Sequence, residues 1–558
     1  MQSLTFTMLW LASSCMLGAV YGSWLPESSN PRVTLTNGTL VGNYNLALHQ
    51  DEFLGIPYAQ PPINDLRFRR PQPLNTPWPN IRPATEYSAF CRGVPMSLPG
   101  FTQQGSQFQH SEDCLTLNVV RPSGHGQGRK LPVLFWIHGG GLQDGGSGDP
   151  RYNMSFMVDE SVKMGSPIIG VSINYRLSGW GFLAGSQMNA SGNTNLGLHD
   201  QRMALLWVQE NIGAFGGDSE KVTIHGESSG ALSVGYHILA HNGQNQGLFR
   251  AAIAQSGGVV NPNGPLTIEE QDVTYTRVLN MTGCLDSIDS LGCLRSASTD
   301  SLDSAFLAVS FNPVIDGTLV PDIQSRSLRE GRFAKVPLLI GTNRNEGTAL
   351  ASAAGRSTSN STDFLSIIKA FDSVQGLSSS TAQELLEVYT VSLSSDEVAS
   401  LLGTVKTSPN ETFGFLYGHT SIYLGDFFFT AGKRFSAQIW SQHGVPAYSY
   451  RFDIVPNGIS AEVLGSTHFQ EVAFVFRNLR GLGYDINPFS SPSDMESRRL
   501  RQQSLHMTLP ELHVVWPKYD NHDPKSLVFG QSKLTIEPDT SNTEGIARII
   551  DAYGELRV

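Results

Sequence analysis

The feature that most constrains the fold is a succession of short apolar runs separated by stretches of helical spacing. Between two of these runs, residues 195–215 place leucines and other apolar residues at helical intervals. Alternation of buried strands with helices predicts an α/β fold, with a large and mostly parallel sheet covered by helices on both faces. The predicted strands lie within 131–139, 167–175, 221–226, 249–256, 336–341 and 446–455.

The 558 residues contain no internal repeat and no linker. Large α/β enzymes often place such a length in one domain, so we predict a single domain over residues 23–558. Residues 1–22 hold an apolar run with small residues near Gly22, which is typical of a secretory signal peptide although the usual positive charge is missing. The alternative is a membrane anchor, but the run is shorter than the roughly 20 residues that a spanning helix needs.

Cysteines and glycosylation sequons also favour an extracellular location. Cys15 lies in the predicted signal peptide, and the four other cysteines form an even set that allows three pairings: Cys91, Cys114, Cys284 and Cys293. Asn-X-Ser/Thr sequons are candidate glycosylation sites in an exported protein. They begin at Asn37, Asn153, Asn189, Asn280, Asn360 and Asn410.

Charge and spacing exclude several function classes. With a net charge of -11, the chain shows no excess of basic residues that would indicate electrostatic binding to nucleic acid. No Cys/His spacing indicates zinc, and no glycine-rich loop carries the lysine of a phosphate cradle. We therefore expect no metal and no organic cofactor.

A serine motif lies between a predicted strand and a predicted helix. Gly226-Glu227-Ser228-Ser229-Gly230 is G-x-S-x-G, in which glycines permit a sharp turn that exposes a nucleophilic serine above a helix N-terminus. The pattern alone is weak evidence for a catalytic serine, because a chain this rich in glycine and serine can contain it by chance. Its placement after a strand favours the catalytic interpretation over a simple turn.

Three consecutive glycines, Gly139 to Gly141, follow the apolar run that ends near residue 138. Backbone amides without side chains could approach a substrate oxygen closely there, as in the oxyanion loop of esterases. The alternative is a flexible surface turn. An acid and a histidine must follow the serine in chain order, and Glu346 and His468 are candidates, although 14 histidines and 49 acidic residues offer many other pairs.

These motifs closely resemble the type-B carboxylesterase/lipase family, the cholinesterase-like α/β-hydrolases. The C-terminal residues 526–539 resemble those of secreted fungal members. Ten ordered motifs carry the family resemblance across nearly the whole mature chain: "FLGIPYAQPP", "LRFRRPQP", "SEDCLTLNV", "WIHGGG", "NYRL", "NLGLHDQRMALLWVQENIGAFGGD", "GESSGA", "AQSG", "PVIDG" and "NEGT".

The resemblance implies an α/β-hydrolase fold with loop and helix insertions over the active site, and a role for each motif residue. Ser228 would be the nucleophile, His468 the general base and acid, and Glu346 the carboxylate that orients the imidazole. The oxyanion hole would use the amides of Gly140, Gly141 and Ser229. The implied disulfides are Cys91 with Cys114 and Cys284 with Cys293.

The chain departs from the family pattern at three places. Ser229 replaces the alanine of many relatives, and Val472 with Ala473 replaces their Leu-Pro after the histidine. The loop at 92–113 lacks the tryptophan with which cholinesterases bind choline, which argues against cholinesterase activity. Met96, Leu98 and Phe101 in that loop could form a modest lid.

Other residues near the motifs have structural alternatives. Glu227 and Ser256 resemble a supporting polar network in relatives, but either could be an ordinary buried hydrogen-bonding group. We expect His225 to be a packed histidine rather than the base. The aromatic cluster at 425–435 is better explained by packing than as the lining of an acyl pocket.

The combined interpretation is a secreted serine esterase that cleaves a small-molecule carboxylic ester through a Ser228 acyl-enzyme. Alternatives within the enzymes are a lipase for longer-chain acylglycerols and an esterase or acyltransferase dedicated to one secreted metabolite. A non-catalytic binding protein with the same fold is the alternative outside the enzymes.

Overall fold

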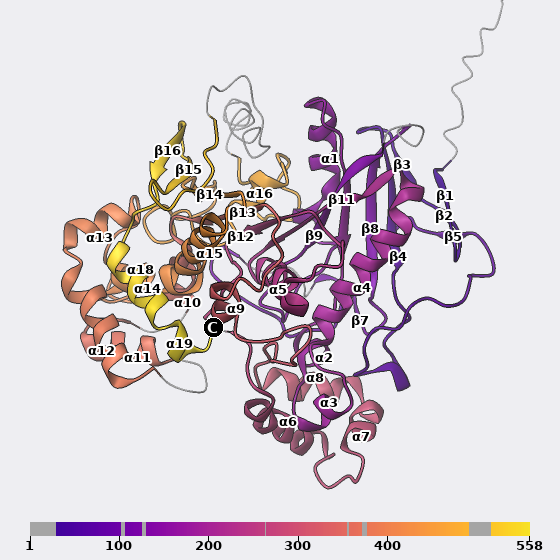
Figure 1. Ribbon diagram of the computed structural model, residues 1–558, viewed down its shortest axis with the longest axis horizontal. Helices are drawn as coiled ribbons and strands as arrows, with labels where there is room; N and C mark the ends of the chain where they lie inside the picture. The colour runs from indigo at the N-terminus through magenta and orange to yellow at the C-terminus, as the bar shows by residue number, and fades with distance from the viewer. Residues whose placement is uncertain are drawn as a thin grey trace, which may run out of the picture.

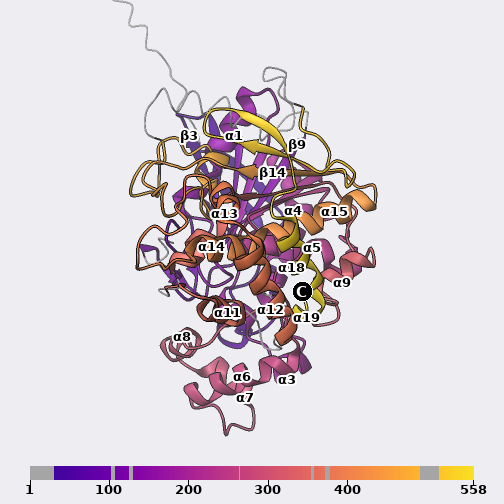
Figure 2. The ribbon, with the colours of Figure 1, turned by 90° about the vertical axis from the view of Figure 1, so that its left-hand side faces the viewer.

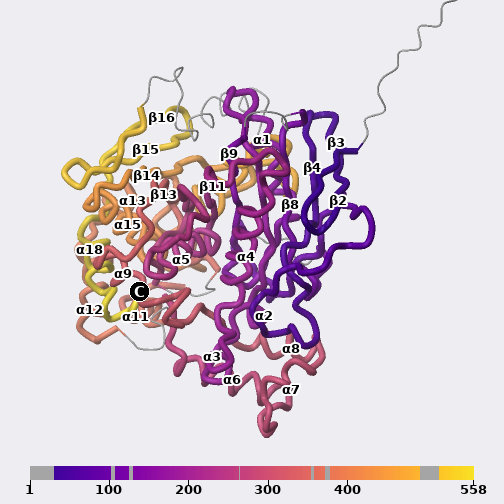
Figure 3. The backbone as a smooth tube through the Cα atoms, turned by 45° about the vertical axis from the view of Figure 1, so that its right-hand side comes forward, coloured from indigo at the N-terminus to yellow at the C-terminus, as the bar shows by residue number. Residues whose placement is uncertain are grey.

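All the predicted strands belong to one eleven-stranded sheet in the computed structural model, which describes residues 30–101, 107–124, 130–262, 264–353, 357–370, 377–489 and 515–558. Figures 1 and 3 show the sheet crossing the molecule. Its strands are β3 Asn43–Asn45, β4 Gln50–Pro57, β8 Thr116–Pro122, β9 Leu131–Ile137, β10 Ile169–Ile173, β11 Gly217–Glu227, β12 Ala251–Gln255, β13 Leu338–Asn343, β14 Ala447–Phe452, β15 Lys525–Phe529 and β16 Leu534–Pro538.

The strand order is β16-β15-β14-β13-β12-β11-β9-β10-β8-β4-β3. Neighbours from β10 through β9, β11, β12, β13 and β14 to β15 pair in parallel. The antiparallel pairs lie at the two ends, where β3, β4, β8 and β10 follow one another on one side and β16 pairs with β15 on the other. The predicted mostly parallel α/β architecture is therefore confirmed.

Both faces of the sheet are buried, as the continuous apolar runs predict. Along β9, Val133, Phe135 and Ile137 pack into the large cluster that also contains residues of α4 and α5. Leu134 and Trp136, which point to the other face, pack with Met157 and Val158 of α1. The period of two in a strand thus divides one apolar run between two hydrophobic layers.

Helices cover the sheet and extend beyond its edges. In Figures 1 and 2, α6, α7 and α8 lie together at the bottom of the molecule, and α10 to α14 form a group on the left in Figure 1. The group on the left includes three helices between residues 361 and 402, α11 to α13. The α-helices are α1 Met154–Lys163, α2 Ser178–Phe182, α3 Ser186–Ala190, α4 Leu196–Asn211, α5 Ser229–Gly243, α6 Ile268–Thr282, α7 Ser290–Ser296, α8 Thr299–Leu307, α9 Gln324–Arg329, α10 Glu346–Ala353, α11 Ser361–Ala370, α12 Ser379–Glu387, α13 Ser395–Leu402, α14 Tyr417–Gly425, α15 Ala431–Gln442, α16 Val472–Val475, α18 Thr543–Asp551 and α19 Tyr553–Leu556.

Two small sheets and several single-turn or π-helical elements complete the described chain. One small sheet has the order β1-β2-β5, and the other pairs β6 with β7. Their strands are β1 Arg32–Leu35, β2 Gly38–Val41, β5 Arg82–Pro83, β6 Phe90–Cys91 and β7 His110–Ser111. The remaining elements are the 3-10 helices η1 Asn64–Leu66, η3 Pro150–Tyr152 and η4 Ile212–Phe215, and the π-helices η5 Val388–Ser392 and η6 Asp426–Thr430.

The two disulfides pair Cys91 with Cys114 and Cys284 with Cys293. The expected signal peptide at 1–22, with Cys15, lies outside the described residues. Among the residues that are described, no helix combines the length and the apolar character needed to span a bilayer.

A buried ion pair ties the end of β10 to α4. Arg176 and Asp200 are 4% and 0% exposed, and their side chains approach to 2.7 Å. Asp200 also accepts hydrogen bonds from the Arg176 amide at 3.1 Å and from Nε at 2.8 Å. Because the Asp200 carboxylate is buried and paired with Arg176, which follows β10, the pair fixes α4 against the edge of the sheet at which the strands end.

We predict that Asp200→Ala destabilises the fold by about 3–5 kcal/mol, because it leaves the Arg176 charge buried without a carboxylate. The measurement is the free energy of unfolding from chemical denaturation. Arg326→Ala is the control, since Arg326 pairs with Asp322 at 2.9 Å but its side chain is 56% exposed. That variant should lose less than about 1 kcal/mol. Equal losses in the two variants would contradict the structural role of the buried pair.

Candidate active site

The turn from β11 to α5 presents Ser228. This serine has φ of 55° and ψ of -125°, a conformation rare for a residue with a side chain. A Cβ on Gly226 would lie 2.3 Å from the Gly230 carbonyl carbon, and a Cβ on Gly230 would lie 2.1 Å from the Ile137 oxygen. Both glycines of the G-x-S-x-G motif are therefore required by backbone crowding.

Three side chains that the sequence predicts from separate motifs lie next to one another, and the middle one is within hydrogen-bonding distance of both others. His468 Nε2 is 2.9 Å from Ser228 Oγ, and His468 Nδ1 is 2.7 Å from Glu346 Oε2. The second carboxylate oxygen of Glu346 accepts from the Asn343 amide at 2.6 Å. With Nδ1 donating to the carboxylate, Nε2 of the neutral imidazole is left to accept a proton from the serine hydroxyl.

Asn343, the last residue of β13, joins the acid to the histidine loop. Its side-chain amide donates to the Thr467 carbonyl and to Glu471 Oε2, each at 2.7 Å. Glu346 lies three residues after Asn343, and His468 directly follows Thr467. The Asn343 side chain therefore aligns both the acid and the histidine. The sequence does not reveal the role of Asn343, because nothing local distinguishes it from the other asparagines of the chain.

The triglycine segment lies beside Ser228. A Cβ on Gly139 would lie 2.8 Å from the Glu227 oxygen and 3.0 Å from the Ser228 Cβ. Gly140 and Gly141 have φ of 102° and 66°. Within the described part of the chain, neither of their amides donates a hydrogen bond. Close approach and unengaged amides are what an oxyanion-binding loop requires.

Buried carboxylates surround His468. Glu227 is 0% exposed, and its Oε1 lies 3.4 Å from His468 Nε2. Burial raises the pKa of Glu227 well above its usual value, while His468 lowers it. Burial and the charge of Glu346 raise the pKa of Glu471 to about 7. Glu471 also accepts a hydrogen bond from Ser256 Oγ at 3.3 Å, so Ser256 belongs to a polar network through a carboxylate that the sequence does not single out. Within the described part of the chain, neither carboxylate oxygen of Glu227 has a hydrogen-bond partner.

The pKa of His468 reflects these opposing effects. Burial lowers this pKa, but the carboxylates of Glu227 and Glu346 raise it by a larger amount. The pKa of His468 is therefore raised to about 9. An ionised Glu227 stabilises the imidazolium, whereas a protonated Glu227 does not, so the two groups titrate as a pair. The site therefore favours the charge that the histidine would carry after it has taken a proton.

Apolar side chains enclose the histidine. The Phe429 ring centroid lies 4.7 Å from that of His468, and that of Phe101 lies 6.1 Å away. Met96 lies close to the glycine loop, since a Cβ on Gly141 would be 3.1 Å from its sulfur. The segment with Met96 and Phe101 is held by a hydrogen bond from Gln470 Nε2 to the Gly100 oxygen at 2.6 Å.

The aromatic cluster at 425–435 has two roles in the structure. Phe427 is fully buried, as the packing interpretation predicts, but Phe429 of the same π-helix η6 is half-buried and faces His468. A π-helical turn changes the direction of successive side chains in a way that apolar periodicity does not reveal. His225 is a packed histidine, since it is 2% exposed, hydrogen-bonds to Gln255 and contacts Trp136 edge to face.

The sequons differ in exposure. Asn189, Asn280, Asn360 and Asn410 are exposed. Asn37 is half-buried and donates to the Leu74 oxygen at 3.2 Å. Asn153 is half-buried and caps α1 by accepting from the Ser155 amide at 2.9 Å. Over the described ranges, no cluster of three or more His, Cys, Asp or Glu residues is arranged to hold a metal ion.

Comparisons with known proteins extend the sequence resemblance. The Carboxylesterase family matches residues 29–506. Lipase 4 of Diutina rugosa is 42% identical over 350 residues, which are 58% of this chain and 63% of that protein. The chain thus aligns with less than two thirds of that lipase.

Two further similarities cover more of the chain. Secreted lipase 1 of Botryotinia fuckeliana is 33% identical over 493 residues, which are 81% of this chain and 82% of that protein. The crystal structure of Aspergillus niger EstA superposes with a TM-score of 0.79 at 28% identity, over 95% of this chain and 99% of that chain. The chain belongs to the carboxylesterase family.

Proposed function

We propose that the protein is a carboxylic ester hydrolase that acts through a Ser228 acyl-enzyme. The observation that carries the proposal is the continuous series Ser228, His468 and Glu346, joined at 2.9 and 2.7 Å beside a loop of three glycines. A non-catalytic binding protein would have no need of this alignment, nor of the strained backbone at Ser228.

In the acylation step, Ser228 Oγ attacks the ester carbonyl carbon while His468 Nε2 takes the hydroxyl proton. The carbonyl oxygen becomes an oxyanion, which the amides of Gly140, Gly141 and Ser229 stabilise. Collapse of the tetrahedral intermediate breaks the bond to the alcohol oxygen, and His468 gives its proton to the leaving alcohol. Glu346 holds the imidazole in orientation and stabilises its positive charge throughout.

In the second step, water attacks the acyl carbon of Ser228 and passes a proton to His468. The second intermediate collapses to the carboxylic acid and the free serine. Water is the acceptor in hydrolysis, whereas an alcohol in the same position would give acyl transfer to a metabolite. The chemistry requires no metal or organic cofactor.

The apolar surroundings of His468 support esters with a hydrocarbon acyl or alcohol group. Met96, Phe101 and Phe429 would exclude water and offer no charged partner to a substrate. A lipase is the second candidate, since two similar proteins are named lipases and the segment at 92–101 lies over the site.

We also propose that the protein is secreted after loss of residues 1–22. Two disulfides, four exposed sequons and similarity to a protein named a secreted lipase support this location. The mature chain from residue 23 would then form one α/β-hydrolase domain.

Replacement of the proposed nucleophile tests the mechanism. We predict that Ser228→Ala lowers kcat for p-nitrophenyl esters by at least about 10,000-fold, because no other group can form the acyl-enzyme. A serine-directed organophosphate should label the wild type at Ser228, as located by peptide mass spectrometry. Wild-type turnover in the folded Ser228→Ala variant, or labelling at another serine, would overturn the assignment.

The preferred length of the substrate's acyl chain distinguishes an esterase from a lipase. With p-nitrophenyl esters from acetate to palmitate, we expect kcat/KM to peak at short acyl chains, because Phe101 and Phe429 leave limited space around His468. Phe429→Ala should move the peak to longer chains, while Phe428→Ala, a half-buried neighbour on η6, should not. A wild-type optimum at palmitate, with activity rising above the micellar threshold, would instead favour the lipase.

The carboxylates around His468 predict an unusual pH dependence. Because they raise the pKa of His468 to about 9, kcat/KM should rise with pH well beyond 6.5, the ordinary value for histidine. Glu227→Gln removes the largest contribution that raises this pKa, so its midpoint should move to lower pH. Asp322→Asn, which removes a charge paired with Arg326 and Arg332, should leave the midpoint unchanged. Midpoints near 6.5 in all three proteins would contradict the prediction.

A further inference from the structure

The hydroxyl of Ser229, the residue after the proposed nucleophile, accepts a hydrogen bond that an alanine could not accept. Ser229 is 2% exposed, and its Oγ accepts a hydrogen bond from the Leu142 amide at 3.0 Å. Tyr175 is fully buried; burial raises the pKa of its phenol, and the neighbouring Ser229 hydroxyl lowers it. The Tyr175 hydroxyl donates to the His138 carbonyl oxygen at 2.8 Å.

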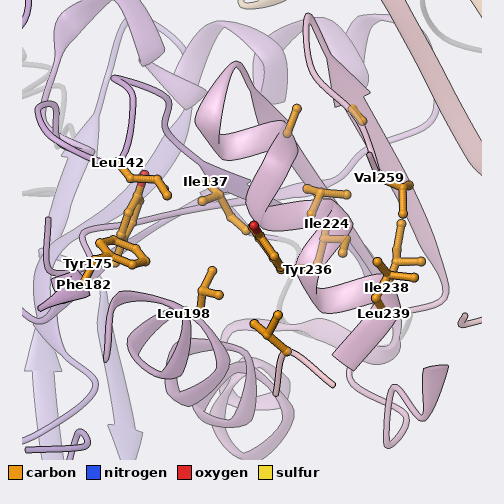
Figure 4. Packing of buried hydrophobic residues seen from close by; sticks show 14 of the residues in the cluster. Ile137, Leu142, Tyr175, Phe182, Leu198, Ile224, Tyr236, Ile238, Leu239 and Val259 are labelled. Carbon is orange, nitrogen blue, oxygen red and sulfur yellow. The ribbon is translucent and has the colours of Figure 1, made fainter. Parts of the chain in front are cut away.

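These two bonds hold the two ends of the glycine loop. His138 immediately precedes the triglycine segment, and Leu142 immediately follows it. Ser229 therefore holds the Leu142 amide, and Tyr175 holds the His138 carbonyl. In Figure 4 the hydroxyl end of Tyr175 points towards Leu142. Ser229 and Tyr175 thus connect both ends of the loop to the start of α5 and the end of β10.

The loop has a conformation that needs such support. Leu142 has φ of 59°, in the left-handed region that residues with side chains seldom adopt, and it follows Gly140 and Gly141 at positive φ. The Leu142 oxygen accepts from the Ser178 amide at 2.7 Å, which holds the turn from its far side. The bond from the Leu142 amide to Ser229 is the one directed towards the nucleophile.

We propose that the hydroxyls of Ser229 and Tyr175 are positioning groups for the oxyanion hole. They set the distance between the Gly140 and Gly141 amides on one side and Ser228 with the Ser229 amide on the other. This inference rests on the proposed ester hydrolysis and explains the serine at a position where many relatives have alanine. Neither hydroxyl touches the substrate.

A positioning role affects the transition state more than substrate binding. The amides are needed where negative charge develops, so small errors in their placement reduce kcat while leaving ground-state contacts in place. A merely structural role would instead lower the amount of folded enzyme without changing the properties of each active molecule.

The experiment compares Ser229→Ala, Tyr175→Phe and the double variant, with kcat calculated per site titrated by the organophosphate. Since all backbone donors remain, each single variant should lose about 10-fold in kcat, less than the roughly 100- to 1000-fold cost of a missing donor. KM should stay within about 2-fold. The double variant should lose more than either single one, because the two hydroxyls hold opposite ends of the glycine loop.

An arylboronic acid, which forms a tetrahedral adduct with the proposed nucleophile, gives an independent readout. Its affinity should fall by the same factor as kcat/KM in Ser229→Ala, because the adduct places an oxygen in the oxyanion hole. The carboxylic acid product should bind the variant and the wild type equally well.

Ser161→Ala is the matched control. Ser161 is 2% exposed, and its hydroxyl also bridges two backbone groups, accepting from the Ile168 amide at 3.1 Å and donating to the Val158 oxygen at 2.7 Å. It lies on α1 near the start of β10, whereas the glycine loop follows the end of the parallel strand β9. Its kcat per titrated site should equal that of the wild type.

Wild-type kcat and boronate affinity in both Ser229→Ala and Tyr175→Phe would overturn the positioning role and leave the proposed hydrolysis intact. An equal fall in Ser161→Ala would also overturn it, since the effect would then follow from loss of any buried hydroxyl. A wild-type protein without Ser228-dependent turnover would overturn the proposed hydrolysis, and this inference with it.

Discussion

Backbone crowding between β9, β11 and α5 is the constraint on which the rest of the site depends. A Cβ on Gly226 would collide with the Gly230 backbone, one on Gly230 would collide with the Ile137 oxygen, and Gly139 lies against the backbone of Glu227. This contact brings the start of α5, the serine and the glycine loop into one small volume before any side chain contributes. The long β13-to-α16 region then needs only to deliver an acid and a histidine to a position that the backbone has already fixed.

Electrostatics at the site involve a compromise between burial and charge. Three carboxylates lie near His468 with almost no exposure, which costs free energy unless a proton or a cation compensates. Burial raises the pKa of Glu227, and an imidazolium at His468 would be stabilised by the negative charges of Glu227 and Glu346. The negative charge that is unfavourable around a neutral His468 would therefore become favourable once His468 is protonated, which is the state that the proposed attack by Ser228 would produce.

The sequence predicts the parts of this structure that depend on local rules. Apolar runs of strand length identify the parallel sheet, and the glycines around Ser228 and at 139–141 identify the two turns that backbone crowding requires. It does not predict Phe429 beside His468, since a π-helix alters side-chain direction without altering composition. It also does not predict Asn343 or Glu471, whose roles follow from contacts between β13 and a loop more than a hundred residues later. Local sequence patterns are sufficient to predict the backbone elements. They do not predict the side-chain packing between segments that lie far apart in the sequence.

Several residues with a strained backbone lie where these segments meet. Leu142, Ser178, Ser228, Ser256 and Phe469 all have positive φ, and all lie in or next to the candidate active site. Hydrogen bonds oppose this strain, since the Ser228 amide donates to the Gln255 oxygen and the Ser256 amide to the Gly341 oxygen, each at 2.9 Å. Leu142 differs because its amide depends on the Ser229 side chain rather than on backbone. The glycine loop at 139–141 is therefore the strained element of the site whose geometry a single side-chain substitution could alter without disturbing the sheet.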